Sequence, residues 1–254
     1  MLFYVLMVRW FRVKETRSVY NKRNFEILLF FVFLLIPVFV LSISTGRMDD
    51  FYMHPIIVFV ALLAMLLTNN IEIPILYDVK TRKPSYSPQE IDLISEMYSV
   101  PVGAELSTGK ERVYDSTITL NLGGFIIPLV LAAYVMSVIY TLNDSVQLQS
   151  IIITLSIIVI VTHLFSEVKS GVGILVPEYI GLLTVPIAFV VSPEMPATII
   201  LVSGILGILI GIITSLVAMK RGEKGSAFFN LGGGGNFNAV YIAVLLSVFV
   251  SFLK

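Results

Sequence analysis

The sequence predicts an all-α integral membrane protein with about seven transmembrane helices, some of them interrupted by glycine or proline. Of its 254 residues, 57% are hydrophobic and 13% are charged, whereas charged residues make up about 25% of an ordinary soluble domain. The mean hydropathy is +0.93. The 17 basic and 17 acidic residues balance, so no nucleic acid is expected as a partner, because such a partner needs excess positive charge.

The spans follow from the length of the apolar segments. A bilayer core is about 30 Å thick, and a helix needs about 20 apolar residues to cross it. Segments of roughly that length predict spans near residues 25–43, 53–77, 119–141, 150–166, 171–192, 196–219 and 237–253. The fourth segment is the shortest and its link to the fifth is short, so a re-entrant hairpin is the alternative for this pair.

The distribution of lysine and arginine orients these spans. With the N-terminus inside, all of the 17 basic residues except Arg47 and Lys254 fall in cytoplasmic segments, in agreement with the positive-inside rule. The sequence therefore predicts a multi-pass plasma-membrane protein with a cytoplasmic N-terminus and an extracellular C-terminus. We expect a basic cytoplasmic or interfacial N-terminus, residues 1–24, and a single transmembrane domain, residues 25–254, with the lipid bilayer as its surroundings.

One long cytoplasmic insertion, residues 78–118, interrupts the transmembrane domain. Ser87 and Glu90 have the spacing of a capping box, with proline between them at the first helical position. The apolar residues that follow fall on one stripe, which predicts a short amphipathic helix. The later segment ERVYDSTITL, residues 111–120, is rich in β-branched residues and is expected to be extended. The insertion is also a candidate docking site for a cytosolic partner.

The tetrapeptide NLGG occurs twice, at residues 121–124 and 230–233. Each copy lies on the cytoplasmic side of an outgoing span and follows an incoming span with methionine and proline at its outer end. Spans two and three are therefore predicted to repeat spans six and seven, with the insertion in the first copy. Repeats built around a shared site are common in transporters.

Polar residues, glycines and prolines collect near the cytoplasmic ends of five spans, whereas the outer halves of these spans are Ile, Leu, Val and Phe. This asymmetry predicts a cavity open to the cytoplasm. The starts of spans three, five and seven would offer free N–H groups to a small anionic ligand. The predicted ligand-binding residues are Asn69, Asn70, Glu72, Asn121, Gly123, Gly124, Glu178, Asn230, Gly232, Gly233, Gly234, Gly235, Asn236 and Asn238.

The same residues have a purely structural interpretation. Glycines allow helices to approach closely, and asparagine can cap a helix without binding anything. The occurrence of such residues in five spans at one depth is what favours a binding site over packing alone.

Metal and catalytic sites receive less support. His163 and Glu167 lie four residues apart and would share a helix face, but a metal site needs a third ligand at a fixed spacing. No catalytic residue and no cofactor is predicted. The chain has no cysteine, no nucleophile elbow accompanies His163, and the proposed spans contain no aspartate for an aspartyl protease.

Four motifs carry a family resemblance. NLGGFIIPL at residues 121–129, GVGILVP at 171–177, VSGILGILIG at 202–211 and GGGGNFN at 232–238 resemble, in order and spacing, an archaeal and bacterial group of multi-pass membrane proteins, domain of unknown function sixteen-fourteen. The likeness covers roughly residues 55–250. The family pattern implies an aspartate after the phenylalanine of the last motif and another acid after the glycines of span six. This chain has Asn238 and Ile213 at those places.

Three functions are compatible with the sequence. The first is binding or transport of a small solute in the cytoplasm-facing cavity. The second is assembly with a cytosolic protein through the 78–118 insertion, with the glycines serving packing. The third is an intramembrane hydrolase or lipid-modifying enzyme that uses Glu72, Glu178 or His163, which would require these three groups to converge.

Overall fold

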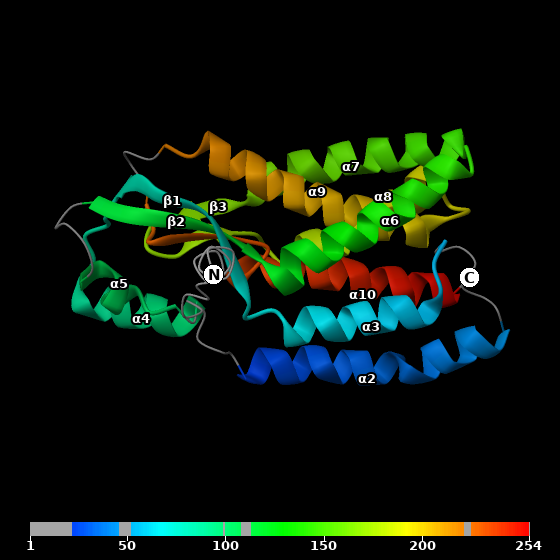
Figure 1. Cartoon of the computed structure of the whole chain (residues 1–254), viewed down its shortest axis with the longest axis horizontal. Coiled ribbons are helices and arrows are strands. Elements are labelled where there is room, and N and C mark those ends of the chain that lie inside the picture. Colours follow the sequence, from blue (N-terminus) through cyan, green and yellow to red (C-terminus); the bar gives the residue numbers. More distant parts are fainter. Residues whose placement is uncertain (1–21, 46–51, 99, 108–112, 221–224, 254) are drawn as a thin grey trace, which may run out of the picture.

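The computed structural model describes residues 22–45, 52–98, 100–107, 113–220 and 225–253. The helices gather at one end of the long axis and the strands, with two short helices, at the other (Figure 1). The expectations for residues 1–21 and for Arg47 lie outside the described residues.

In chain order the elements are α2 (Lys22–Thr45), α3 (Pro55–Leu67), β1 (Glu72–Arg82), α4 (Pro88–Tyr98), α5 (Val102–Ser107), β2 (Val113–Asn121), the π-helical turn η2 (Leu122–Ile126), α6 (Ile127–Thr141), α7 (Ser145–Phe165), β3 (Glu167–Lys169), β4 (Gly173–Leu175), α8 (Tyr179–Val191), α9 (Pro196–Ala218), β5 (Phe228–Leu231), the 3₁₀ turn η3 (Gly234–Asn236) and α10 (Phe237–Leu253).

Four of the described helical segments are long and apolar enough to cross a membrane: Leu122–Thr141, Ser145–Phe165, Pro196–Ala218 and Gly234–Leu253. Three further apolar helices, Glu26–Leu41, Ile56–Leu67 and Tyr179–Val191, are shorter. Helices α3 and α8 have 13 residues each, which corresponds to about 20 Å. The membrane class is therefore confirmed, whereas seven full spans are not.

Helix α9 is the centre of the bundle. In its most apolar window 72% of the residues are buried, compared with 28% for α7. Its glycines admit the neighbouring helices: a Cβ at Gly207 would lie 2.6 Å from Ile158 Cγ2 of α7, and one at Gly204 would lie 3.0 Å from Ala243 Cβ of α10. Small residues at helix contacts are the usual means of close packing in a membrane.

A three-stranded sheet corrects the all-α prediction. Its order is β1-β2-β5, with β1 antiparallel and β5 parallel to β2. Predicted span two, residues 53–77, is therefore wrong in its second half, because the helix ends at Leu67 and the chain continues as β1. Pro74 removes a backbone donor and disfavours helix. It lies on an edge strand, where proline is tolerated, and the pairing is irregular immediately after it.

A second correction concerns predicted spans four and five. Helix α7 runs to Phe165, and the chain then forms the antiparallel hairpin β3–β4 before α8 begins at Tyr179. The start of predicted span five, residues 171–178, is therefore not helical. Gly171 and Gly173 both have positive φ, at +78° and +113°, which glycine adopts without steric penalty.

The predicted amphipathic helix in the insertion is confirmed as α4, and the predicted extended segment is confirmed as β2. Together α4 and α5 form a cap on the hairpin β3–β4. A small core of Ile94, Val100, Val102 and Val172 joins the two parts, and the Tyr86 hydroxyl donates to the Ser170 carbonyl at 2.8 Å. The cap therefore rests on the hairpin through both apolar and polar contacts.

The start of α4 carries the predicted capping box. The backbone N–H and the hydroxyl of Ser87 donate to Glu90 Oε2 at 2.8 and 2.9 Å. These hydrogen bonds, the backbone one first, hold the pKa of the Glu90 carboxyl below its ordinary value. A folded-state pKa that is lowered gives stability that is present above the unfolded pKa and is lost as the pH falls through the folded one.

We therefore expect the amide protection factors of α4 to fall as the pH drops below the ordinary glutamate range, measured by hydrogen exchange. Ser87→Ala should lower protection of α4 severalfold at neutral pH, because it removes the N-cap hydroxyl. Gln89→Ala, an exposed neighbour, is the control and should leave protection unchanged. Equal protection in the Ser87→Ala protein and the wild type would contradict the capping role.

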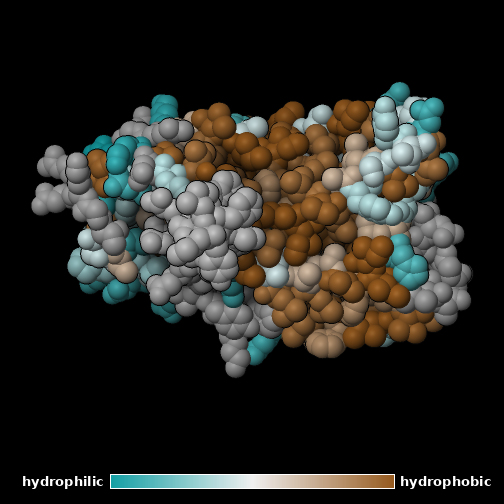
Figure 2. Space-filling model, in the orientation of Figure 1, coloured by the Kyte–Doolittle hydropathy of each residue, from teal (hydrophilic) through white to brown (hydrophobic). Residues whose placement is uncertain are grey.

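The surface agrees with a membrane-embedded bundle. Figure 2 shows hydrophobic residues over the middle of the molecule and hydrophilic residues toward its two ends. Large exposed apolar side chains are frequent on α7, such as Ile153 at 52% and Ile160 at 59% exposed. Exposed apolar side chains at this frequency are unusual on soluble monomers and are expected on a helix that faces lipid.

Candidate functional site

The two NLGG motifs lie side by side at the boundary between sheet and bundle. Each begins at the end of a strand and leads into a helix, because β2 continues into α6 and β5 into α10. The two strands are parallel neighbours, with Thr119 opposite Asn230 and Leu120 opposite Leu231. Parallel strands that each feed a helix bring their carboxyl ends to one edge, where ligands of open sheets commonly bind.

Backbone contact joins the two motifs. A Cβ on Gly124 would overlap the carbonyl oxygen of Gly232 and lie 2.8 Å from its carbonyl carbon, whereas one on Gly232 would lie 2.6 Å from the Gly124 carbonyl. Gly232 also has a φ of +81°. Gly123 packs on the end of α3, with an ideal Cβ 2.9 Å from the Asn69 nitrogen. These three predicted site glycines therefore serve packing at the junction.

Buried polar side chains form hydrogen bonds across the three strands of the sheet at this junction. Glu72 of β1, which is 7% exposed, accepts a hydrogen bond from the Thr119 hydroxyl at 3.0 Å. The side-chain amide of Asn230, on β5, donates to the other carboxylate oxygen of Glu72. Each of the three strands thus contributes one residue to these hydrogen bonds, and the pairing of the strands sets the distances between the three side chains.

Two more asparagines join this row. The Asn121 amide donates to the backbone carbonyl of Asn69, while Asn121 Oδ1 accepts from the Gly124 N–H at 2.7 Å and caps the following turn. The Asn236 amide donates to the Asn230 carbonyl at 3.0 Å. We call Asn69, Glu72, Asn121, Asn230 and Asn236, together with Thr119, the Asn/Glu cluster.

Three side-chain oxygens of the cluster lack donors. Within the described part of the chain, Oδ1 of Asn69, Asn230 and Asn236 is buried and accepts no hydrogen bond. The amide nitrogens of Asn230 and Asn236 donate to a carboxylate and a carbonyl, so exchanging O and N would set two acceptors against each other. The oxygens of Asn230 and Asn236 are therefore correctly placed as acceptors, and neither has a donor among the described residues.

A small pocket of about 30 Å³ opens onto the cluster. It is enclosed partly by the cap, through Tyr98 and Val100, and partly by the hairpin, through Val172, Ile174 and Leu175. On the cluster side it is lined by Glu72, Asn230, Gly233, Gly234 and Gly235.

Lys169 of the hairpin contacts Tyr98 of the cap beside this pocket. Its ammonium group donates to the Tyr98 hydroxyl at 2.9 Å and lies 4.6 Å from the centroid of the Tyr98 ring. The hydrogen bond to Tyr98 is the main cause that holds the pKa of Lys169 above its ordinary value. The charged form of Lys169 therefore stabilises the contact between the cap and the hairpin.

Other predicted site residues lie elsewhere. The Asn238 amide donates to Glu178, where α10 and α8 begin, and neither residue lines the pocket. Asn70 follows α3 at the turn into β1. Sequence reasoning missed Thr119, Tyr98 and Val100. No alternation marks Thr119, because residues 116–119 of β2 are all buried. Tyr98 and Val100 reach the site only through the position of the cap.

His163 and Glu167 lie at a different pocket. That pocket has a volume of about 300 Å³ and is formed by the ends of α7 and α9, with Ser166, Ser215 and Lys220 among its lining residues. His163 Nδ1 is 3.2 Å from Thr214 Oγ1. No group of three His, Cys, Asp or Glu side chains that could hold a metal occurs among the described residues.

The enzyme hypothesis required Glu72, Glu178 and His163 to converge. Glu72 bonds to Thr119 and Asn230, Glu178 to Asn238, and His163 to Thr214 and Ser215. The three groups have different neighbours, so they do not form one site.

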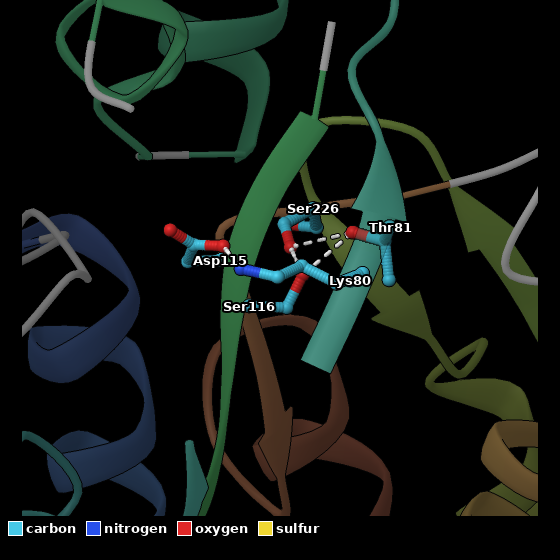
Figure 3. Close-up of polar contacts among 5 residues, drawn as sticks. All are labelled: Lys80, Thr81, Asp115, Ser116 and Ser226. Carbon is cyan, nitrogen blue, oxygen red and sulfur yellow. Dashed lines mark hydrogen bonds and ion pairs between the residues drawn. The ribbon is translucent and has the colours of Figure 1, made fainter. Parts of the chain in front are cut away.

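Further along the sheet, hydroxyl groups fix the strands to each other (Figure 3). Thr81 Oγ1 and Ser116 Oγ are 2.6 Å apart, and the Ser116 hydroxyl donates to the Ser226 carbonyl at 2.6 Å. The ion pair between Lys80 and Asp115 lies at the surface, with 65% and 51% of the side chains exposed. We assign the buried hydroxyl contacts to the stability of the sheet, whereas an exposed ion pair of this kind contributes little.

Comparison with known proteins gives one match. Residues 66–250 match the family model described as "Protein of unknown function (DUF1614)". Searches of curated proteins and of solved structures gave no match. The family model covers both NLGG motifs, the hairpin, α9 and most of α10. The chain is therefore a member of the DUF1614 family of proteins of unknown function.

Proposed function

We propose that this protein binds a small polar solute in the Asn/Glu cluster, and that this binding serves transport of the solute across the membrane. The observation that carries the proposal is the set of three buried amide oxygens without donors beside the carboxylate of Glu72. Buried polar groups are normally paired, since an unpaired one costs about 1–3 kcal/mol. A bound solute would supply the missing partners.

The position of the cluster supports a role in transport. It lies where the chain leaves the sheet and enters α6 and α10, two helices of the bundle. Polar sites at interrupted helices and at the junction of repeated units are the usual binding sites of secondary transporters. The order helix, strand, NLGG, helix occurs in both α3–β2–α6 and α9–β5–α10, which supports a repeat, with β1 and the cap inserted in the first copy.

We further propose that the sheet end faces the cytoplasm and that the membrane is the plasma membrane. The sheet, the hairpin and the segments beside them carry Lys80, Arg82, Lys83, Lys169 and Lys220. Basic residues beside apolar spans favour the cytoplasmic side. The C-terminal end of α10, at the opposite end of the bundle in Figure 1, would then be extracellular.

A matched pair of variants tests solute binding. Thermal unfolding of the purified protein in detergent is measured with a panel of salts, amino acids, sugars, nucleosides and organic acids. We expect at least one compound to raise the Tm of the wild type in a saturable manner. Glu72→Gln should weaken that effect at least about tenfold, equivalent to about 1.4 kcal/mol. Glu178→Gln changes an exposed carboxylate outside the pocket and should keep the wild-type response.

Two results would contradict the proposal. The first is that no compound in the panel raises the Tm of the wild type. The second is that Glu72→Gln and Glu178→Gln weaken the rise in Tm equally. Flux of the stabilising compound into proteoliposomes then tests transport itself, because a binding protein that does not transport would show stabilisation without flux.

A second candidate function is docking of a cytosolic protein on the cap. Leu93 and Met97, one helical turn apart on α4, are 60% and 63% exposed. They form an apolar face on a helix whose other side covers the pocket. If docking is the function and the cluster is only structural, no compound in the panel stabilises the wild type.

A further inference from the structure

We infer that the pocket at the ends of α7 and α9 binds the headgroup of an aminophospholipid, a phosphodiester that carries a primary ammonium group. The pocket has a volume of about 300 Å³, which lies at the lower end of the range for small-molecule sites, about 300–1,000 Å³. No described residue lines both this pocket and the pocket at the Asn/Glu cluster. The headgroup site is therefore separate from the proposed solute site.

The pocket lies where two apolar helices end. Both α7 and α9 are long and apolar enough to cross a membrane, and the lining residues belong to their last turns or directly follow them. Phe165, next in the chain to the lining residue Ser166, forms an edge-to-face pair with Tyr179, and both aromatic side chains are exposed. Tyrosine is enriched at the membrane–water interface, which supports a position of the pocket at the depth of the lipid headgroups.

Exposed apolar side chains flank the pocket on both helices. Leu164 of α7 and Val217 of α9 are largely exposed, and each is next in the chain to a lining residue, His163 and Ala218. A ligand with a polar head and apolar chains would use both kinds of surface. A soluble amine or phosphate would use the polar part alone.

The serine hydroxyls of the pocket give their protons to the protein itself. Ser215 Oγ donates to the Gly211 carbonyl at 2.9 Å and is hydrogen-bonded to Ser166 Oγ. Ser166 Oγ also lies 3.3 Å from the carbonyl oxygen of His163. A hydroxyl has one proton and two acceptor lone pairs. The capacity that Ser166 has left for a ligand is therefore that of an acceptor.

The His163 ring and Glu167 also present acceptors. His163 Nδ1 lies 3.2 Å from Thr214 Oγ1, whose proton goes to the Gly211 carbonyl at 2.8 Å. This contact is a hydrogen bond only if Nδ1 carries the ring proton, which leaves Nε2 of the neutral ring as an acceptor. Glu167 lines the pocket with an exposed carboxylate. The polar groups at the helix ends therefore favour a ligand that brings hydrogen-bond donors.

The charges of the pocket favour a zwitterion. Glu167 and Lys220 are the charged side chains among the described lining residues, one of each sign. The C-terminal ends of α7 and α9 add partial negative charge, which attracts a cation. An ammonium group beside Glu167 would supply three N–H donors, and the charge of Lys220 would offset that of the phosphodiester. An ethanolamine headgroup has both charges.

Lys169 is the nearest basic side chain to Glu167 along β3. It interacts with Glu167 through its charge, but its ammonium group donates to the Tyr98 hydroxyl of the cap. Lys169 does not line the pocket at the helix ends. The carboxylate of Glu167 is therefore accessible to a ligand from the pocket.

The experiment measures lipid binding by the purified full-length protein in dodecyl maltoside. The micelles are supplied with phosphatidylethanolamine, phosphatidylcholine or phosphatidylglycerol, all with the same acyl chains, while the Tm is followed and native mass spectrometry counts the bound lipids. We expect phosphatidylethanolamine to raise the Tm saturably, at a concentration at least about fivefold lower than phosphatidylcholine requires. The reason is that the choline nitrogen has no N–H to donate.

Two pairs of variants locate the site. Glu167→Gln should raise the half-saturating concentration of phosphatidylethanolamine at least about fivefold, whereas Glu178→Gln, an exposed carboxylate outside this pocket, should leave it unchanged. Ala218→Trp fills the pocket from an exposed position without removing a polar group, so it should also weaken binding. Val190→Trp, exposed on α8 and outside the pocket, is its control.

Glu167→Lys gives a result that a purely structural role would not give. It replaces an anion by a cation, which repels an ammonium group and attracts an anionic headgroup. We expect the preferred lipid to change from phosphatidylethanolamine to phosphatidylglycerol. The Tm without added lipid should stay close to that of the wild type, because residue 167 is exposed. An unchanged order of preference would overturn the headgroup site.

Three further results would overturn it. The first is that the three lipids stabilise the wild type equally or that phosphatidylglycerol is preferred. The second is that Glu167→Gln responds like the wild type. The third is that soluble O-phosphoethanolamine stabilises the protein as strongly as the lipid does, which would identify a soluble ligand instead. None of these results depends on Glu72, so the headgroup site and the proposed solute site can fail separately.

Discussion

Gly124→Ala is expected to prevent the protein from reaching its folded state. The new methyl group would overlap the carbonyl oxygen of Gly232, and both partners are backbone atoms of strand–helix junctions that cannot rotate away. Overpacking in a core costs about 1–3 kcal/mol when side chains can adjust. Here they cannot, so we expect a loss of more than about 3 kcal/mol, seen as the absence of a monodisperse peak in size-exclusion chromatography after detergent extraction.

Gly234→Ala is the matched control in the same loop. Gly234 has a φ of +52°, and an added Cβ would have no neighbour within 4 Å. The change therefore adds only the strain of the left-handed conformation, about 1–2 kcal/mol. We expect a folded protein with a lower Tm. A Gly124→Ala protein with the Tm of the wild type would show that the two NLGG motifs are not in backbone contact.

Gly211→Ala is expected to separate α7 from α9. A Cβ at Gly211 would lie 2.6 Å from Cγ2 of Thr162 and 3.2 Å from the carbonyl oxygen of Val159. Thr162 is fully buried, and a β-branched side chain on a helix has little freedom to move aside. We expect destabilisation at the upper end of about 1–3 kcal/mol, measured as a lower Tm and faster hydrogen exchange in both helices.

The double variant Gly211→Ala/Thr162→Gly tests the contact directly. It moves the side-chain atoms from one helix to the other, so it should recover part of the lost stability, less about 1 kcal/mol for glycine within a helix. Ile213→Ala, on the same helix but 38% exposed, should change the Tm little. No recovery in the double variant would assign the effect of Gly211→Ala to something other than the α7–α9 contact.

Hydropathy predicts the helices of the bundle well, but it does not distinguish the apolar part of β1 from a helix. Predicted spans 196–219 and 237–253 correspond to α9, Pro196–Ala218, and α10, Phe237–Leu253, because proline and glycine mark their ends. Residues 73–77 are also mostly apolar, yet they form part of β1. A short apolar run is compatible with either a helix or a strand. Pairing with β2, which comes later in the chain, decides for the strand.

The sequence predicts which kinds of residue form the site, but it does not predict which of the candidate residues come together in it. The asparagines, glycines and Glu72 stand out because polar groups near apolar spans are unfavourable unless they are used. No local feature of the sequence separates Glu178 and Asn238 from the other predicted site residues. They pair with each other at the starts of α8 and α10, whereas Glu72 pairs with Asn230, 158 residues away.

The sequence by itself determined that this is a membrane protein, where α9 and α10 begin and end, and which end of the bundle carries its polar residues. These properties depend on composition, on local periodicity and on the chemistry of caps and breakers. Only the tertiary structure decided that Glu72, Thr119 and Asn230 meet and that Gly124 touches Gly232. Strand register sets those contacts, and register depends on long-range pairing that no local stretch of sequence encodes.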